Sequence, residues 1–369
     1  MTSPSYLITG QNYLPSLEGW RGVVALCVVS YHFSKLFFGT EWTSCGYLGV
    51  DFFFILSGFI ITRHYEASIA LRTINFKAFA IRRLSRLYPL YIVSIAFFVL
   101  VNVYVIEPLY PVKIVDFGMG PTFAFHAFLQ LLMLGSLSDL AQPNGPVWSV
   151  SVEWMVNMAF FALIWRYRRI PNPALWIVMA LAMLYLFHAS PHVLQSQAGG
   201  IAICRGIAGF ILGSLLFRHH RDLPDITPRV LHLVEAMLFA VVVALMYFHD
   251  DLLDYCVDYI FQLVLFPALI LISLYRQGHI CRIFSSQAIT FLGRISYSIY
   301  LLHYPLAYGM AYTPWIRVMG YPWLGISYIV VLIALSTLSY KFIERPGRYI
   351  GRLLTAKSAK SMAAVQITL

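Results

Sequence analysis

The sequence has 369 residues, of which 60% are hydrophobic and only 11% are charged. Soluble domains average about 45–50% apolar and about 25% charged residues, so this composition excludes a soluble globular enzyme, a disordered chain and a coiled coil. The formal net charge of +10 indicates cytoplasmic loops of a membrane protein, which collect Lys and Arg, rather than a nucleic-acid-binding surface.

Apolar runs follow one another along the whole chain, and each is close to the roughly 20 residues that a transmembrane helix needs. They are long and apolar on all sides, which predicts helices, since barrel strands would be shorter and would alternate. No basic residue precedes Arg21, so we interpret the first run as a retained span rather than a cleaved signal peptide. The runs are 20–38, 47–64, 88–106, 122–138, 147–165, 174–189, 199–217, 231–248, 255–275, 292–311 and 323–343.

The distribution of the 26 basic residues predicts the topology. If run 122–138 does not cross the membrane, every cluster of Lys and Arg falls on one side. The positive-inside rule then predicts an all-α integral membrane protein of about ten transmembrane helices, with both termini cytoplasmic. Run 122–138 becomes one re-entrant or interfacial helix in an external segment from about 107 to 146. The basic residues not on the cytoplasmic side are Lys35, Lys113, Arg205 and Arg317.

Ionisable residues inside the spans are few, and each costs about 2.5–3.5 kcal/mol at the bilayer centre. Arg21 and His32 are eleven residues apart, which puts them on one helix face about 16 Å apart along the axis. This arrangement suits a long anionic substrate, with Arg21 at the cytoplasmic mouth and His32 near mid-membrane. Alternatively, Arg21 snorkels and His32 bonds a neighbouring helix.

The second span brings a carboxylate, Asp51, to about the depth of His32. We expect Asp51 to orient the imidazole and raise its basicity, as the third member of a catalytic triad does. Alternatively, Asp51 reaches the external interface or caps its own helix.

Arg83 and Arg86 lie three residues apart on one helix face at the entrance of the third span. Two guanidinium groups at a membrane mouth suit bidentate phosphate binding. Such a cluster is also typical of a topology determinant or a lipid contact.

Polar residues cluster in two later spans. Ser149 and Glu153 share a face of the run that Trp148 opens, and Glu153 is open to two roles, substrate binding or pairing with the intramembrane Arg205. Trp148 alone would be typical of an interfacial belt. Tyr297 and His303 lie in run 292–311, where His303 either lines a cavity or bonds a backbone carbonyl. The histidines show no HExxH spacing, so the sequence predicts no metal site.

Six motifs in this order span nearly the whole chain: LEGWRGVVALCVVSYHF (17–33), GYLGVDFFFILSGFIIT (46–62), RRLSRLYPLY (82–91), PVWSVSVEWMVN (146–157), SYSIYLLHYPL (296–306) and FIERPGR (342–348). Together they resemble the acyltransferase 3 family of polytopic membrane acyltransferases. The resemblance implies a transmembrane domain over 1–352 and a short cytoplasmic tail over 353–369. Some members of the family carry an added extracytoplasmic domain, and we expect the stand-alone form here.

The resemblance also implies the chemistry. The family transfers an acyl group, usually acetyl, from cytoplasmic acyl-CoA to a carbohydrate hydroxyl that is often exposed outside the cell. His32 matches its essential histidine, which we expect to act as general base. Arg21 matches the cationic partner of that histidine, Arg83 and Arg86 match its basic motif, and Glu153 falls in its SVEW-like motif.

We therefore expect a multi-pass O-acetyltransferase in the cell membrane, specifically the bacterial inner membrane. Its partners would be the lipid bilayer, acyl-CoA as donor substrate and a cell-envelope glycan, with no permanent cofactor and no nucleic acid. The acceptor would lie among Trp148, Ser149, Arg205, Tyr297 and His303. A transporter or flippase of a glycan or lipid-linked sugar is the alternative, although the sequence shows no inverted repeat or broken helices in two halves.

Overall fold

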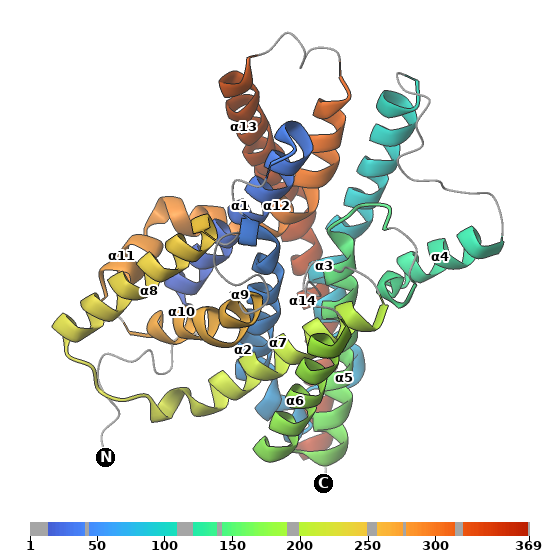
Figure 1. Ribbon diagram of the computed structural model, residues 1–369. Coiled ribbons are helices and arrows are strands. Elements are labelled where there is room, and N and C mark those ends of the chain that lie inside the picture. Colours follow the sequence, from blue (N-terminus) through green and yellow to red (C-terminus); the bar gives the residue numbers. More distant parts are fainter. Residues whose placement is uncertain are drawn as a thin grey trace. The chain divides into compact units, whose positions relative to one another are not determined.

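The computed structural model describes residues 14–40, 44–108, 121–138, 142–189, 199–248, 257–275, 278–313 and 320–367. These residues form helices joined by turns, with no strand among them. Parts of the external segment, 109–120 and 139–141, lie outside the described residues, and so do Lys113 and Arg317. The chain divides into two compact units, whose helices are labelled in Figure 1.

The first unit comprises the described residues of 1–63, 172–196 and 204–297. It takes parts of α2, α7 and α12, and a 3₁₀ turn at Ser44–Leu48 leads into α2. A π-helical turn at Phe261–Leu265 joins α9 to α10. The helices are α1 (Pro15–Phe38), α2 (Gly49–Ala70), α6 (Asn172–Ala189), α7 (Gly199–His219), α8 (Pro228–Phe248), α9 (Val257–Ile260), α10 (Phe266–Ile272), α11 (His279–Phe284) and α12 (Gln287–Ala311).

Close packing of α7 on α2 holds the centre of this unit. A Cβ atom on Gly213 would lie 1.8 Å from the carbonyl oxygen of Ile55, and one on Gly209 would lie 2.8 Å from Cβ of Phe54. The two glycines form a GxxxG pair, which lets helix backbones approach closely in a membrane. This contact brings the polar residues of α7 against those of α2.

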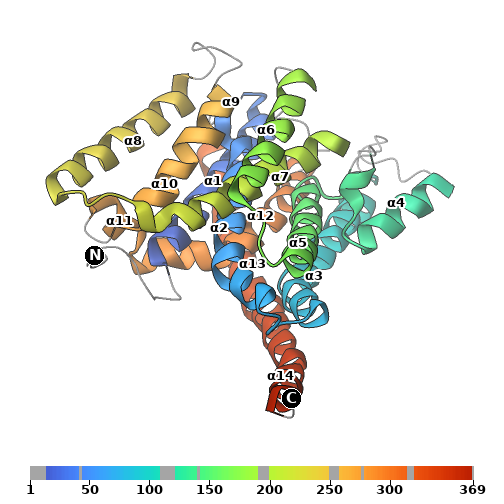
Figure 2. The same ribbon diagram turned by 90° about the horizontal axis from the view of Figure 1, so that it is seen from below.

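The second unit comprises the described residues of 64–171, 197–203 and 298–369. In it α5 and α14 both pack on α3, and the views of Figures 1 and 2 agree in placing α14 alongside α3. Two π-helical turns extend its helices, Asn102–Ile106 after α3 and Tyr340–Glu344 before α14. The helices not yet named are α3 (Phe76–Val101), α4 (Pro121–Leu131), α5 (Val147–Tyr167), α13 (Tyr321–Ser339) and α14 (Arg345–Ile367).

Local sequence explains where several of these helices begin and end. Pro15 opens α1, where its missing N–H costs nothing, and Gly39 ends it with a left-handed φ of 66°. Asn75 caps α3 by accepting a hydrogen bond of 2.8 Å from the backbone N–H of Ala78.

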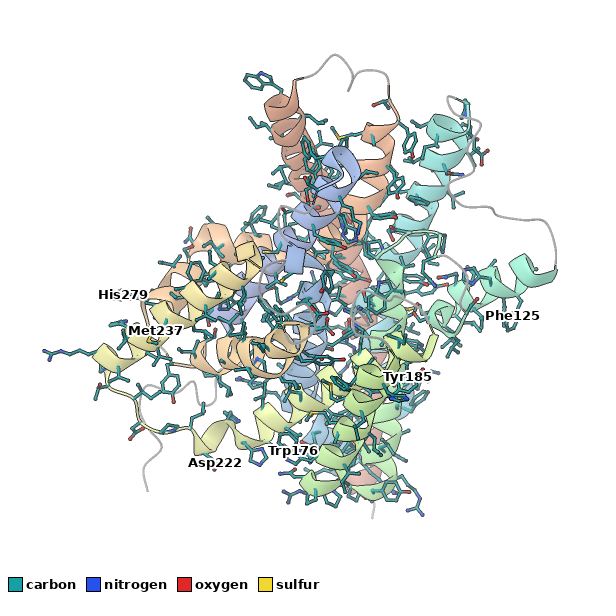
Figure 3. All side chains as sticks on the ribbon, viewed as in Figure 1. Phe125, Trp176, Tyr185, Asp222, Met237 and His279 are labelled. Carbon is teal, nitrogen blue, oxygen red and sulfur yellow. The ribbon has the colours of Figure 1, made fainter. Side chains whose placement is uncertain are left out.

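Eight helices in the described part of the chain are long and apolar enough to cross a membrane. Their outward faces carry large apolar side chains, among them Trp176, Tyr185 and Met237, which Figure 3 labels. Exposed apolar surface on this scale is typical of contact with lipid. The prediction of an all-α integral membrane protein is therefore confirmed.

Three details refine the expected helix pattern. Helix α4 has 11 residues, a length of about 17 Å, and is too short to cross a hydrocarbon core of about 30 Å by itself. Helix α11 lies outside the predicted apolar runs. The last helix continues to Ile367, so residues 353–367 of the expected tail are helical.

Candidate functional site

The candidate base, His32, is half-buried on α1. Its Nδ1 atom lies 3.0 Å from the carbonyl oxygen of Val28, one turn earlier. A carbonyl oxygen only accepts hydrogen bonds, so Nδ1 carries a proton, and in the neutral imidazole Nε2 therefore carries the lone pair. The backbone of α1 thus fixes the tautomer that a general base acting through Nε2 requires.

Arg21 lies three turns before His32 on the same helix. Its Nη1 atom forms an ion pair of 3.1 Å with Oε1 of Glu18, and both side chains are about one-fifth exposed. The guanidinium is therefore held at the start of α1 without being buried.

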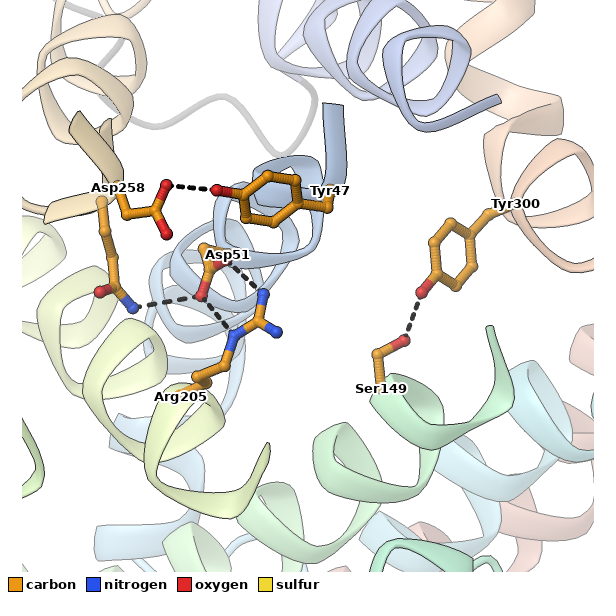
Figure 4. Close-up of polar contacts among 7 residues, drawn as sticks. Tyr47, Asp51, Ser149, Arg205, Asp258 and Tyr300 are labelled. Carbon is orange, nitrogen blue, oxygen red and sulfur yellow. Dashed lines mark hydrogen bonds and ion pairs between the residues drawn. The ribbon is translucent and has the colours of Figure 1, made fainter. Parts of the chain in front are cut away.

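Asp51 is fully buried on α2 and forms an ion pair with Arg205 of α7. The Arg205 Nη2–Asp51 Oδ2 distance is 2.6 Å and the Nε–Oδ1 distance is 3.3 Å, and Gln262 donates a further hydrogen bond of 3.2 Å to Oδ1. Figure 4 shows this cluster. Asp51 does not make the expected contact with His32. Its carboxylate pairs instead with Arg205, whose guanidinium compensates the negative charge. The imidazole of His32 is oriented by the carbonyl of Val28.

The same cluster includes residues that the sequence analysis did not select. Tyr47 donates a 2.5 Å hydrogen bond to the buried Asp258 (Figure 4), and Gln262 lies four residues after Asp258. Two polar residues at this spacing inside the apolar run 255–275 share a helix face. This spacing could have identified Asp258 and Gln262 as candidate site residues from the sequence.

Arg83 and Glu153 form the corresponding pair of the second unit. Arg83 of α3 is buried and donates a hydrogen bond from Nη2 to Oε1 of Glu153 on α5. Each unit thus holds an ion pair of its own, Asp51 with Arg205 in the first and Glu153 with Arg83 in the second. Asn157, one turn beyond Glu153, is fully buried, and neither its amide nitrogen nor its amide oxygen has a hydrogen-bond partner among the described residues.

The start of α5 is tied to α12 through buried hydroxyl groups. Ser149 Oγ and Tyr300 Oη are 2.8 Å apart (Figure 4), and Tyr300 also donates to the carbonyl of Pro146 over 3.3 Å. Trp148 is 3% exposed, and its carbonyl accepts a 2.7 Å hydrogen bond from Ser136. Trp148 therefore packs inside its unit and is not a lipid-facing belt residue.

His303 is fully buried on α12. Its Nδ1 atom lies 2.6 Å from the carbonyl oxygen of Tyr300, and its own carbonyl accepts a 3.0 Å hydrogen bond from Tyr328. The alternative of a bond to a backbone carbonyl is confirmed. Tyr297, also on α12, belongs to the first unit and is half-buried.

The basic motif separates into two environments. Arg83 is buried against Glu153, whereas Arg86, one turn later, is half-buried and lines a cavity of about 610 Å³ in the second unit. Four more arginines line the same cavity: Arg82, Arg345, Arg348 and Arg352. Of the two arginines predicted to bind phosphate, Arg83 and Arg86, only Arg86 faces this cavity.

Comparison with known proteins gives a consistent family signal. Residues 14–341 match the family described as "Acyltransferase domain" of the acyltransferase 3 type. The chain is 27% identical over 91% of its length to the Bacillus subtilis protein named "Putative peptidoglycan O-acetyltransferase YrhL". It is 26% identical over 92% of its length to "Peptidoglycan O-acetyltransferase OatA" of Listeria monocytogenes.

These alignments cover 55% and 56% of the two relatives, so the chain spans just over half their length. No solved structure matches the chain. The family match extends over the first five motifs and ends at residue 341, just before the sixth (342–348), and it includes His32, Arg83 and Glu153. The chain belongs to the acyltransferase 3 family.

Proposed function

We propose that this chain is a membrane O-acetyltransferase that moves an acetyl group from cytoplasmic acetyl-CoA to a hydroxyl group of a cell-envelope carbohydrate. The observation that carries this proposal is the hydrogen bond from His32 Nδ1 to the carbonyl of Val28. It leaves Nε2 as the basic nitrogen of an intramembrane histidine in a member of an acyltransferase family.

In the proposed reaction, Nε2 of His32 accepts the proton of the acceptor hydroxyl as its oxygen attacks the thioester carbonyl carbon. The C–S bond then breaks, an O–acyl bond has formed, and the CoA sulfur leaves and takes up the proton. Arg21, about 16 Å closer to the cytoplasmic end of the same helix, would attract the anionic donor. A positioned general base contributes typically 10²–10⁴-fold to the rate.

Asp51 takes a different part from the one first expected. We assign it and Arg205 to holding α2 and α7 together, since both side chains are buried and paired. Glu153 is assigned to fixing Arg83, and Asn157 offers a buried amide one turn further along α5. Ser149, Trp148, Tyr300 and His303 are buried side chains of the second unit, in the region to which we assign the acceptor.

The carbohydrate acceptor is proposed from the relatives, two of which carry peptidoglycan O-acetyltransferase in their names. A cell-envelope glycan would be acetylated at the bacterial inner membrane. Buried tyrosine, serine and amide groups beside Trp148 are the kind of side chains that hydrogen-bond sugar hydroxyls.

We also propose the ten-crossing topology. Two further segments bring the eight apolar helices to ten crossings. One is α12, which has 25 residues but a lower mean hydropathy, and the other is the shorter apolar segment Val257–Ile272. With these ten crossings and a cytoplasmic N-terminus, the basic clusters of the described chain lie on the cytoplasmic side, as the positive-inside rule requires. The short helix α4 then lies in the external segment.

The test uses the full chain reconstituted in liposomes with radiolabelled acetyl-CoA and cell-envelope glycan. We expect wild type to acetylate the glycan, and His32→Ala to lose at least 100-fold in rate, in line with a lost general base. The matched control is His188→Ala, because His188 is exposed at the end of α6, and this variant should keep the wild-type rate. Normal transfer by His32→Ala would refute the mechanism, and glycan export without acetyl incorporation in wild type would favour a transporter.

A further inference from the structure

The cavity between α3 and α14 is lined by five arginines, two tyrosines and one serine. Its volume of about 610 Å³ falls in the range of about 300–1,000 Å³ typical of small-molecule sites. Arg82 and Arg86 come from α3, and Arg345, Arg348 and Arg352 come from α14. No carboxylate is among the described residues that line it.

The close approach of α14 to α3 creates this cavity. A Cβ atom on Gly351 would lie 2.0 Å from Oγ of Ser85, and one on Gly347 would lie 2.7 Å from the carbonyl oxygen of Ser85. The two glycines are four residues apart on one face, which is the spacing that lets membrane helices pack closely. The arginines of both helices consequently surround one space.

A π-helical turn at Tyr340–Glu344 precedes α14. Pro346 lacks the N–H that an uninterrupted helix would donate to the carbonyl of Phe342, which explains a wider turn at this point. Such turns are frequent at functional sites. Here the turn coincides with Tyr340 and the first arginines of the cavity.

The positive charge in the cavity is only weakly compensated by the protein. Arg348 approaches Oε2 of Glu344 no closer than 3.9 Å, and its guanidinium lies 5.0 Å from the ring centre of Tyr340. Arg82 donates a 3.2 Å hydrogen bond from Nε to the hydroxyl of Thr355, a neutral acceptor. Five arginines gathered around so little negative charge favour an anion of several charges as the ligand.

Helix length places the cavity at the cytoplasmic membrane surface under the proposed topology. The segment Phe76–Ile106 has 31 residues and Trp323–Ala356 has 34, about 46 and 51 Å of helix. Both exceed the hydrocarbon thickness of about 30 Å. The surplus turns of each segment, which carry the arginines, therefore extend into the cytoplasmic interface.

We infer that this cavity binds the phosphorylated adenosine end of acyl-CoA, with the 3′-phosphate and the diphosphate held by Arg86 of α3 and by Arg345, Arg348 and Arg352 of α14. The inference rests on the proposed acetyl-CoA-dependent function. Phosphate groups at two ends of a ribose suit guanidinium groups presented from two helices. Tyr65 and Tyr340 add aromatic faces that suit an adenine ring, which favours a nucleotide over a lipid headgroup.

The test measures equilibrium binding of CoA and of 3′-dephospho-CoA to the purified full chain in nanodiscs. Wild type should bind CoA at least tenfold more tightly than 3′-dephospho-CoA. Arg348→Gln and Arg352→Gln should each weaken CoA binding at least tenfold, and at least one of them should bring the ratio of the two affinities close to one. Arg169→Gln, which removes the same charge from an exposed turn after α5, should bind both ligands as wild type does. Unfolding curves identify any variant that fails to fold, and the conservative Arg348→Lys should recover part of the affinity.

Each other outcome has a defined meaning. Unchanged CoA affinity in both glutamine variants, with normal acetyl transfer in wild type, would overturn the cavity assignment and leave the proposed function intact. Loss of affinity for dihexanoyl phosphatidylglycerol with unchanged CoA affinity would make the cavity an anionic-lipid site and would also overturn it. If wild type neither binds CoA nor transfers acetyl from acetyl-CoA, the proposed function itself fails.

Discussion

The buried ion pair of Asp51 and Arg205 allows a structural role to be separated from a catalytic one. The Asp51 carboxylate is 0% exposed and the Arg205 side chain is 1% exposed. Asp51→Asn keeps the size and the hydrogen bond from Gln262 but removes the negative charge that pairs with the Arg205 guanidinium. Breaking a buried pair in this way costs about 3–5 kcal/mol, so we expect the free energy of unfolding to fall by about that amount.

The assay is equilibrium unfolding in mixed micelles titrated with sodium dodecyl sulfate, with initial acetyl-transfer rates measured at low denaturant. The folded fraction of Asp51→Asn should retain a rate within about threefold of wild type, because Val28 rather than Asp51 orients His32. The matched control is Asp222→Asn at an exposed acid, where a change within about 0.5 kcal/mol is expected.

A double variant, Asp51→Leu with Arg205→Met, removes both charges together. Replacing a buried pair by apolar residues of similar volume is often neutral or stabilising by about 1–4 kcal/mol. The double variant should therefore be more stable than Asp51→Asn. An unchanged unfolding free energy for Asp51→Asn, combined with a rate loss of 100-fold or more, would refute this reasoning and return Asp51 to a catalytic role.

Three further changes test the second unit. Glu153→Gln should lower the unfolding free energy by about 3–5 kcal/mol, because it leaves buried Arg83 without its counter-charge; equal stability in both proteins would contradict the pairing. Tyr300→Phe removes a 2.8 Å hydroxyl–hydroxyl bond and should cost about 0.5–1.5 kcal/mol in the same titration, whereas no loss would argue against this bond. Gly351→Ala should cost about 1–3 kcal/mol through overpacking, and Ser85→Gly in the same chain should restore most of it by removing the atoms that the new Cβ meets; failure of that rescue would show that another contact limits the packing.

Much of the fold follows from the sequence because one physical constraint dominates it. In a bilayer each backbone polar group must be satisfied within its own segment, so every long apolar run had to be a helix, and the structure contains a helix in each run. The short helix α11 was not predicted because six residues (His279–Phe284) leave too little periodicity to read. The extension of α14 was not predicted because its residues are polar, and at its start Thr355 accepts a 3.2 Å hydrogen bond from Arg82 of α3.

Partners of charged side chains were harder to predict than their positions. Asp51, Arg205 and Glu153 were identified as unusual charges inside spans, and Arg83 as a charge at the entrance of one. Helix periodicity gives the face and depth of each residue, but which helices are neighbours depends on long-range packing. The Asp51–Arg205 contact requires α7 to approach α2 closely through Gly209 and Gly213. No local feature of the α2 sequence predicts that contact.

Arg83 and Arg86 show why a shared helix face does not imply a shared role. Three residues along a helix correspond to a rotation of about 300° and a rise of about 4.5 Å, which leaves the two side chains some 60° apart around the axis. That angle is enough for Arg83 to face α5 and Glu153 while Arg86 faces the cavity beside α14. Arg83 is buried and paired with Glu153, so removal of Arg83 should act first on the stability of the protein. Arg86 faces a cavity that has no carboxylate among the described residues lining it, so removal of Arg86 should act first on the affinity for an anionic donor.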